Sequence, residues 1–300
     1  MMEGKTTSAK LGLLYKDRRL EGETSLRQTQ LVQLHLLCVF AKICEDHDID
    51  YWLGFGTLLG ALRHGGPIPW DDDADVWMLE KDFPRFCKFA AEELPDDVFL
   101  TNPDRFPRED TRLVHLVDAY SMALKRSKKN ILVNDHLGIN IDIFLMRRVG
   151  GRNRFVQTVL RIYETFLWRS RHAAFGKVTL CGLLAKWCLL LCRAGAWCLW
   201  SVVQLCCTHK KWLCPFNFNR AWWNSDWHPI ETFYGRGNQT KRYADYDGER
   251  LRIPVEAEKV LEQLYGDWRR LPPENLRKGY FDIKLPTTSC FSRYAMEYPR

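Results

Sequence analysis

The segment from Tyr51 to Met78 constrains the fold more than any other part of this 300-residue chain. It reads YWLGFGTLLGALRHGGPIPWDDDADVWM: a short apolar run ends at a glycine, a helix-like run follows, and glycines and prolines precede a second apolar run. This order predicts a strand over 51–55, a helix over 57–64 capped by Thr57, and a strand over 74–79. The chain is therefore expected to alternate strand, helix and loop in this region.

The first candidate site is the turn from this strand into the helix. Gly56 and Thr57 lie there, so backbone N–H groups without helical partners and the positive end of the helix dipole face one spot. Glycine also lets a phosphate approach the backbone closely. The pattern therefore predicts an anion site at Gly56 and Thr57, although glycine and threonine also open helices for purely structural reasons.

The second candidate site is the acidic run that enters the next strand. Side chains alternate along a strand, so Asp73 and Asp75 are expected on the same face, roughly 6–7 Å apart. Two carboxylates at that spacing favour a hard cation such as Mg²⁺, with Mn²⁺ as an alternative. An acidic run can also be a solvated turn, so this pattern alone leaves both interpretations open.

A third carboxylate lies in the apolar run INIDIF, which predicts a strand. Alternation places Asn140, Asp142 and Phe144 on one face of that strand. Burying an Asp side chain without a partner costs roughly several kcal/mol of folding free energy. Asp142 therefore requires a cation or hydrogen-bond donors nearby. Asp142 is therefore either the third ligand of the same metal or a hydrogen-bonded core residue.

Four further residues have two interpretations each. Arg63 and His64 end the predicted helix and either bind phosphate oxygens or complement the helix dipole. Trp70 either packs the loop, which the pattern favours, or stacks on a base. His115 lies among Leu and Val and is expected to be a core or edge residue rather than a metal ligand.

The rest of the pattern indicates an α+β fold. An amphipathic helix is expected over 25–48, where apolar residues recur at helical spacing, and two long helical stretches follow Gly150 as far as about residue 207. The other expected elements are a helix over 81–94, strands over 98–101, 112–117, 120–125 and 139–145, a hairpin of 243–246 with 250–253 across Asp247-Gly248, and a helix over 255–265.

The expected organisation is one main domain between two terminal segments. Residues 1–23 are interpreted as a loose arm, 24–285 as the domain and 286–300 as a tail. The domain is divided into a catalytic core over 24–150, a helical region over 151–230, and a hairpin with a closing helix over 231–285.

Net charge and cysteine content limit the kinds of binding partner and the cell compartment that we expect. A net charge of +7 favours an anionic substrate or membrane surface over nucleic acid, for which the sequence contains no recognition motif. The eleven cysteines contain no C-x-x-C pair and are interpreted as buried thiols, which predicts a reducing compartment. The first 23 residues lack the apolar run of a signal peptide, so a cytoplasmic location is expected.

The stretch from Val178 to Cys207 is apolar but carries Lys186 and Arg193, which interrupt any long uncharged run. These two residues are seven apart and predict one narrow polar stripe on a broad apolar helix. We expect this helix to lie on an anionic membrane, giving peripheral attachment, or in a groove of the protein. An ordinary core helix fits the same pattern equally well.

The segment from Trp52 to Asp75 resembles the LicD family, which includes bacterial phosphorylcholine transferases and fukutin-type glycan phosphotransferases. The shared pattern is W-L-x-x-G-T-L-L-G-A-x-R-H-x-G-x-I-P-W-D-D-D-x-D. The runs IDIF and IPVEAEKVLEQLYGDWRRLPPENLRKGY resemble later elements of the family. Phe55, Pro67 and Trp77 depart from the family pattern, and the larger Phe55 and Trp77 are expected to change the shape of the donor pocket.

The resemblance implies a nucleotidyltransferase-like mixed sheet with helices, followed by a mostly helical C-terminal half. It also implies a metal triad of Asp73, Asp75 and Asp142 beside a phosphate-side motif at Gly56 and Thr57. The implied reaction is transfer of a phosphorylated alcohol, such as phosphocholine or a polyol phosphate, from a CDP-linked donor to a glycan or glycolipid hydroxyl. The alternatives are nucleotidyl transfer from an NTP and a catalytically silent, membrane-associated scaffold.

Overall fold

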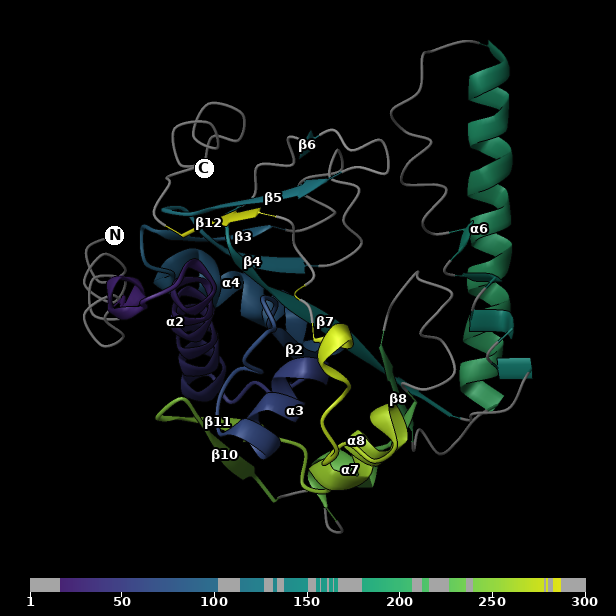
Figure 1. Cartoon of the computed structure of the whole chain (residues 1–300). Coiled ribbons are helices and arrows are strands. Elements are labelled where there is room, and N and C mark those ends of the chain that lie inside the picture. The colour runs from purple at the N-terminus through teal and green to yellow at the C-terminus, as the bar shows by residue number, and fades with distance from the viewer. Residues whose placement is uncertain are drawn as a thin grey trace.

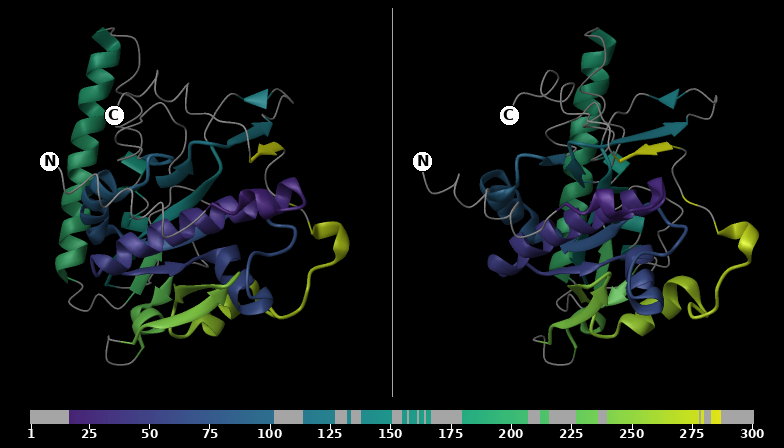
Figure 2. Two further views of the ribbon diagram at one scale, coloured as in Figure 1. Left: turned by 90° about the vertical axis from the view of Figure 1, so that its left-hand side faces the viewer. Right: turned by 60° about the vertical axis from the view of Figure 1, so that its left-hand side comes forward.

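The computed structural model describes most of the chain and places its helices around a mixed sheet (Figures 1 and 2). This arrangement confirms the predicted α+β class. The described residues are 17–101, 114–126, 132–133, 138–150, 155–166 except 157, 161 and 164, 180–206, 212–215, 227–235, 240–277, 279 and 283–286.

The main sheet has seven strands, and its central pair is parallel. β2 (Asp75–Leu79) pairs in parallel with β7 (Asn140–Val149), and every other pair in the sheet is antiparallel. All five residues of β2 are buried, which fits its Val, Trp, Met and Leu side chains. The strand order is β1 (Tyr51–Leu53), β2, β7, β4 (Val114–Asp118), β3 (Val98–Thr101), with β8 (Trp212–Pro215) on β7 and β9 (His228–Pro229) on β8.

Helix α2 (Ser25–Asp46) packs against strands β4 and β7 and is capped by Thr24, whose hydroxyl accepts a hydrogen bond from the Arg27 amide at 3.1 Å. It is buried on nearly all sides from Thr29 to Cys44. The prediction that one face of this helix is exposed was therefore wrong. Strands β11 (Glu249–Ile253) and β12 (Ile283–Leu285) contact α2 in addition to β4 and β7.

Helix α3 (Phe55–His64) begins two residues earlier than predicted, with Gly54 as its N-cap. Thr57 is therefore in the first turn, and the prediction that it caps the helix was wrong. Its hydroxyl is already engaged, since it accepts a hydrogen bond from the Asp75 amide at 2.7 Å. The helix ends at Gly65, whose φ of 66° is in the left-handed region that favours glycine.

Most other predicted elements lie within a few residues of their expected positions. The predicted helix over 81–94 is a 3-10 turn (Glu80–Asp82) followed by α4 (Phe83–Glu93). The predicted hairpin is β10 (Arg242–Tyr246) with β11 (Glu249–Ile253), and α8 (Ala257–Tyr265) is the closing helix. The elements that the sequence did not predict are β6 (Leu132–Val133), β8, β9, α7 (Ile230–Tyr234) and β12 (Ile283–Leu285), which pairs with β5 (Met122–Arg126).

One large hydrophobic core joins the two halves of the sequence. It contains side chains from α2, β1, β2 and β7 together with Phe233, Leu251 and Leu261 from beyond residue 230. Asp50 adds polar contacts, because its carboxylate accepts hydrogen bonds from Tyr234 at 2.6 Å and from Arg252 at 2.8 Å. The hairpin and closing helix are therefore packed against the sheet.

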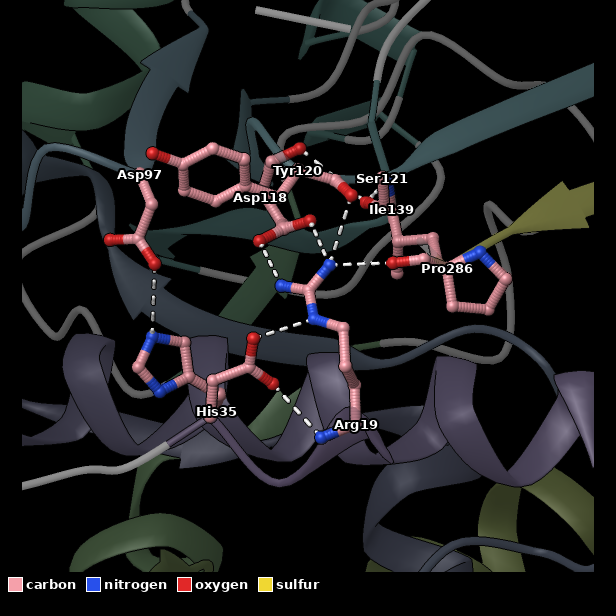
Figure 3. Close-up of polar contacts among 9 residues, drawn as sticks. Arg19, His35, Asp97, Asp118, Tyr120, Ser121, Ile139 and Pro286 are labelled. Carbon is pink, nitrogen blue, oxygen red and sulfur yellow. Dashed lines mark hydrogen bonds and ion pairs between the residues drawn. The ribbon is translucent and has the colours of Figure 1, made fainter. Parts of the chain in front are cut away.

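The described start of the chain is attached to the domain through Arg19, in the 3-10 turn Arg19–Glu21 (Figure 3). The guanidinium group donates two hydrogen bonds to Asp118, at 2.6 and 3.1 Å, and one to the carbonyl oxygen of Pro286 at 2.6 Å. Arg19 and Asp118 are both buried. Residues 1–16 of the predicted loose arm lie outside the described residues.

Helix α6 (Leu180–Cys206) lies along one side of the molecule, beyond the end of β7 (Figures 1 and 2). Among the described residues, no helix is long and apolar enough to cross a membrane. Cys188, Cys192 and Cys198 on this helix are exposed free thiols, so the prediction of buried thiols was wrong for them. It is confirmed for Cys38, Cys44 and Cys214.

Candidate active site

The parallel pairing of β2 with β7 brings two of the predicted carboxylates together. Asp75 opens β2 and lies directly opposite Asp142 in the register. The Asp142 amide also donates to the Ala74 carbonyl oxygen at 2.8 Å, which extends the pairing to the start of β2. Residues 67 positions apart in the sequence are therefore neighbours at one edge of the sheet, as the predicted triad requires.

Asp75 is in an environment that disfavours its charge. The residue is only 8% exposed, and burial raises the pKa of its carboxyl group well above the ordinary range. The charges of Asp73, Asp142 and Asp71 raise it further. Asp75 thus interacts with three other carboxyl groups at the start of β2, and it is the most deeply buried of these four.

Asp71 is a member of this cluster that sequence reasoning missed. Burial, the charge of Asp73 and a side-chain hydrogen bond with Asp73 raise the pKa of Asp71 to about 8. A hydrogen bond between two carboxyl groups requires a shared proton, as expected for like charges held close together. The signal in the sequence was spacing, because Asp71, Asp73 and Asp75 recur at every second position of the acidic run.

The donor chemistry of the cluster fits a hard divalent cation. All its donors are carboxylate oxygens, the ligands that Mg²⁺ prefers, and a cation would replace the proton and relieve the repulsion that raises these pKa values. Within the part of the chain that the structure describes, no three His, Cys, Asp or Glu side chains already stand in metal-binding geometry. The carboxylates would therefore rotate to bind an ion.

The first turn of α3 lies against the cluster. A Cβ atom at Gly56 would lie 2.9 Å from Oδ2 of Asp71, so glycine is needed for this approach. The amides of Gly56 and Thr57 are in the first helical turn, where N–H groups have no acceptor within the helix. Phe55, which opens the helix, has a φ of 36°, an unusual value for a residue other than glycine and typical of strain at functional sites.

Phe55 and Trp77, two of the departures from the family pattern, pack against each other. Their rings meet edge to face at 5.0 Å, and Phe144 of β7 contacts Phe55 in the same way at 4.9 Å. Phe55 and Trp77 are both buried. Two large residues therefore fill one space under the start of α3, in the core rather than in an open pocket.

Asp142 is held by two residues of the sheet. Nδ1 of His115 on β4 lies 2.7 Å from Oδ1 of Asp142, and the Asn140 amide donates to the same oxygen at 2.7 Å. His115 is buried in the sheet, as predicted, and it is also the cross-strand partner of Asp142. Sequence reasoning missed this second role. The signal was a lone polar side chain in the apolar run VHLV.

The backbone of the acidic loop is fixed by two glutamines of α2, which sequence reasoning also missed. The Gln30 side chain donates to the carbonyl oxygens of Ile68 and Asp71 at 3.1 and 2.9 Å. The Gln33 side chain donates to the carbonyl oxygen of Asp72 at 2.8 Å. Both glutamines are buried, so these bonds satisfy groups that would otherwise be costly to bury.

Arg63 and His64 lie at the other end of α3. Seven residues of helix separate Gly56 from Arg63, about 10 Å along the axis. The Arg63 guanidinium donates to the Trp268 carbonyl oxygen at 2.9 Å and to Nε2 of His64 at 3.0 Å. Burial and the charge of Arg63 lower the pKa of His64. Binding of phosphate by Arg63 and His64 stays a prediction.

Trp70 packs the loop between α3 and β2, as the sequence pattern favours. It is partly buried against the core, and the Arg277 guanidinium lies over its ring, 5.2 Å from the centroid. Trp227 and Tyr234, which belong to an aromatic-rich part of the sequence over 216–234, are buried. These aromatic side chains therefore contribute to packing.

Comparison with known proteins finds relatives of the segment that contains this site. Residues 48–151 match the family model described as LicD/FKTN/FKRP, nucleotidyltransferase domain. The chain is similar to the lipopolysaccharide cholinephosphotransferase LicD of Haemophilus influenzae, with 53% identity over 69 residues, or 23% of this chain and 26% of that protein. It is also similar to the human ribitol 5-phosphate transferase FKRP, with 48% identity over 40 residues, or 13% of this chain and 8% of that protein.

The chain thus covers about a quarter or less of the length of these relatives. The matched segment nevertheless includes α3, the acidic loop, β2, β4 and all of β7. These are the elements that supply Gly56, Asp73, Asp75, His115 and Asp142. The resemblance read from the sequence is confirmed over residues 48–151, which match the nucleotidyltransferase domain of the LicD family.

Proposed function

We propose that this chain is a metal-dependent transferase that moves a phosphorylated alcohol from a CDP-linked donor to a hydroxyl group of a glycan or glycolipid. The observation that carries the proposal is the partly buried carboxylate cluster of Asp71, Asp73, Asp75 and Asp142 within the matched segment. The two relatives named above are both, by name, transferases of a phosphorylated alcohol.

Asp73, Asp75 and Asp142 would hold Mg²⁺, with Mn²⁺ as an alternative and Asp71 as a further ligand. When bound there, the cation supplies positive charge that stabilises the negative charge developing on the phosphoryl oxygens. Thr57 holds the start of β2 in place through its bond to the Asp75 amide, and Gln30 and Gln33 hold the acidic loop. The carboxylates are thereby positioned by neighbours that do not take part in the chemistry.

The reaction we propose is an in-line attack by the acceptor hydroxyl on the β-phosphorus of the CDP-alcohol. A new oxygen–phosphorus bond forms, the bond to the bridging oxygen breaks, and CMP leaves with that oxygen. Asp142 accepts or orients the hydroxyl proton, because His115 and Asn140 fix one of its oxygens and leave the other for a second partner. The first-turn amides of α3 would bind the donor phosphate.

The products distinguish this reaction from its closest rival. Nucleotidyl transfer would use the same carboxylates, but it attacks the α-phosphorus of an NTP and releases pyrophosphate. We expect the full-length chain with Mg²⁺ and a glycan acceptor to release CMP from CDP-choline, CDP-ribitol or another CDP-alcohol, measured by mass spectrometry. Pyrophosphate release from CTP, without CMP from any CDP-alcohol, would replace this proposal with the rival.

The same assay tests two other assignments. Absence of turnover with every donor and metal, in a folded protein, would favour the silent scaffold. Substitution Arg63→Met should raise the KM for the donor several-fold if Arg63 contacts phosphate. An unchanged KM would restrict Arg63 to its observed bond with the Trp268 carbonyl oxygen.

A further inference from the structure

Helix α6 presents large apolar side chains to solvent along much of its length. The exposed fractions are 65% for Trp187, 70% for Leu191, 56% for Trp197, 54% for Val202 and 80% for Leu205. Exposed apolar residues scattered singly are ordinary, but a contiguous set on one helix marks an interaction surface. The core-helix interpretation of this stretch was therefore wrong.

The packed side of α6 is narrow. Ala196, Trp200 and Val203 are buried and lie at positions i, i+4 and i+7, which is one stripe of a helix. Trp200 and Val203 belong to a small core with Val149 of β7 and Cys214 of β8. The helix is thus anchored to the end of the sheet through one seam, and most of its circumference is available to a partner.

One stripe of the exposed side of α6 lies directly opposite the seam. Its members are spaced 4, 3, 4, 4 and 3 residues apart, as an α-helix requires for one face. They are Trp187, Leu191, Ala194, Cys198, Val202 and Leu205, and all six are exposed. We refer to them as the outer stripe.

The exposed apolar surface is wider than a partner helix would cover. At 100° per residue, the exposed large apolar side chains of α6, from Trp197 round to Leu199, occupy an arc of about 200°. A helix–helix seam uses a stripe closer to about 100° and is normally bordered by charged residues. The helix contains no Asp or Glu, and its only charged residues are Lys186 and Arg193.

The sequence that includes α6 is basic, which favours an anionic partner. Between Glu164 and Asp226 the sequence contains no acidic residue and eight basic ones, which exceeds the net charge of +7 of the whole chain. These basic residues are Arg169, Arg171, Lys177, Lys186, Arg193, Lys210, Lys211 and Arg220. A basic segment with exposed Trp and Leu side chains has the chemistry of helices that lie at the surface of anionic bilayers.

We propose that the outer stripe of α6 docks on an anionic lipid bilayer, with the helix in the plane of the membrane interface. The large apolar side chains enter the boundary between headgroups and acyl chains, where Trp is favoured, and the basic residues attract anionic headgroups. The rest of the domain remains in water and is attached to the helix through the packed seam at Trp200 and Val203. This inference does not depend on the proposed chemistry.

Vesicle flotation of the full-length chain tests the proposal. We expect the protein to float with vesicles of phosphatidylcholine and phosphatidylserine, less with phosphatidylcholine alone, and less again at high salt. Alkaline carbonate should release it, as expected for a helix lying in the interface. Failure to float with any vesicle, or resistance to carbonate, would overturn the proposal.

A matched pair of variants locates the contact. The double substitution Trp187→Gln and Leu191→Gln should lower the vesicle partition coefficient at least about tenfold, because two large apolar side chains no longer enter the lipid. The control is Leu20→Gln with Leu276→Gln, two residues that are equally exposed, at 81% and 65%, but lie on other elements. Equal flotation of the two double variants would contradict the proposal.

The free thiols of α6 give a site-resolved measurement. Cys198 belongs to the outer stripe, whereas Cys192 lies nearer the packed seam, and both are exposed. Anionic vesicles should slow modification of Cys198 by a water-soluble maleimide more than that of Cys192, measured by peptide mass spectrometry. If protection instead requires high protein concentration without lipid, and sedimentation shows a dimer, a second copy of the chain covers the stripe and the proposal fails.

Discussion

The two longest helices of the structure contrast in a way that hydropathy alone would reverse. Helix α2 carries Gln30, Gln33 and His35 and is nonetheless buried on nearly every side. Helix α6 is far richer in Leu, Trp and Cys, and its apolar residues are largely exposed. Whether a helix is buried therefore depends on which elements pack against it. The polarity of its side chains determines only the free energy that this burial costs.

The difference separates two kinds of functional surface. The polar residues of α2 are tolerated inside because Gln30 and Gln33 donate to carbonyl oxygens of the acidic loop, so each buried amide is used. The apolar residues of α6 face water, where they gain nothing in the isolated molecule. The first helix supports a site inside the domain, and the second is explained by a partner outside it.

The largest expected effect is at the site that α2 supports. Substitution Asp75→Asn should lower turnover by about 10³-fold, because an amide cannot replace the charge of a carboxylate at a divalent cation. The fold should remain, since burial and three neighbouring carboxylates already disfavour the Asp75 charge. Asp73→Asn should lower turnover as much as Asp75→Asn does, and Asp142→Asn nearly as much. Turnover assays measure the loss, and urea unfolding checks that each variant is folded.

A neighbouring aspartate provides the control for that substitution. Asp72 is adjacent to the cluster and is also buried, but it is out of phase with the alternation of Asp71, Asp73 and Asp75. Asp72→Asn should therefore reduce turnover much less than Asp75→Asn. A variant of Asp73, Asp75 or Asp142 that keeps a tenth of the wild-type activity would remove that residue from the proposed triad.

The second prediction concerns the pH dependence of stability in the metal-free protein. The pKa of Asp71 is raised from 3.8 to about 8 on folding, so the folded state binds more protons than the unfolded state between these values. The stability that this group contributes is therefore present below pH 4 and is lost as the pH rises toward 8.

Between pH 4 and pH 8, the free energy of unfolding should fall on the order of 2 kcal/mol further for the wild type than for Asp71→Asn. Urea unfolding in the presence of a chelator measures this difference. Added Mg²⁺ should reduce the loss, because a bound cation favours the charged carboxylates. Parallel pH profiles of the wild type and Asp71→Asn would show that the carboxyl group of Asp71 is not perturbed as described.

The third prediction concerns His115, which acts through Asp142. Substitution His115→Ala should lower kcat about tenfold with little change in KM, because Asp142 loses a partner that orients it. Substitution His115→Asn should restore part of the loss, since an amide can still donate to the carboxylate. The control is His35→Ala on α2, another buried histidine near an aspartate, Asp97 at 4.0 Å, which should affect stability without affecting kcat.

The sequence predicted the elements of the site better than their surroundings. Local signals sufficed for the strand, helix and acidic strand over Tyr51–Leu79, because glycines and prolines mark each boundary. Asp142 could be added from alternation along one strand. Its pairing with Asp75 could not be derived, since parallel register between distant strands is set by the whole sheet rather than by either sequence.

The missed residues are those whose role depends on a distant partner. Gln30, Gln33 and His115 each bond to a segment at least 25 positions away, and their local sequence does not indicate which segment that is. Thr57 shows the same limit on a smaller scale. Its type predicted a helix cap, but its hydroxyl bonds to the Asp75 amide on the neighbouring strand.

The smallest expected effect tests the contrast between the two helices directly. Substitution Gln33→Leu on α2 replaces a buried polar residue by an apolar one of similar size and leaves the Asp72 carbonyl oxygen without that donor. It should cost about 1 kcal/mol of unfolding free energy and lower turnover several-fold, because the acidic loop loses one of its fixed points.

Substitution Leu191→Gln on α6 makes the opposite exchange at a residue that is 70% exposed, so stability and turnover with a water-soluble acceptor should both stay within error. Turnover with an acceptor embedded in anionic vesicles should fall for Leu191→Gln as well, because docking then limits access to the acceptor. If Leu191→Gln destabilises the protein in solution as much as Gln33→Leu does, the outer stripe is covered by the protein itself, and the contrast between the two helices does not hold.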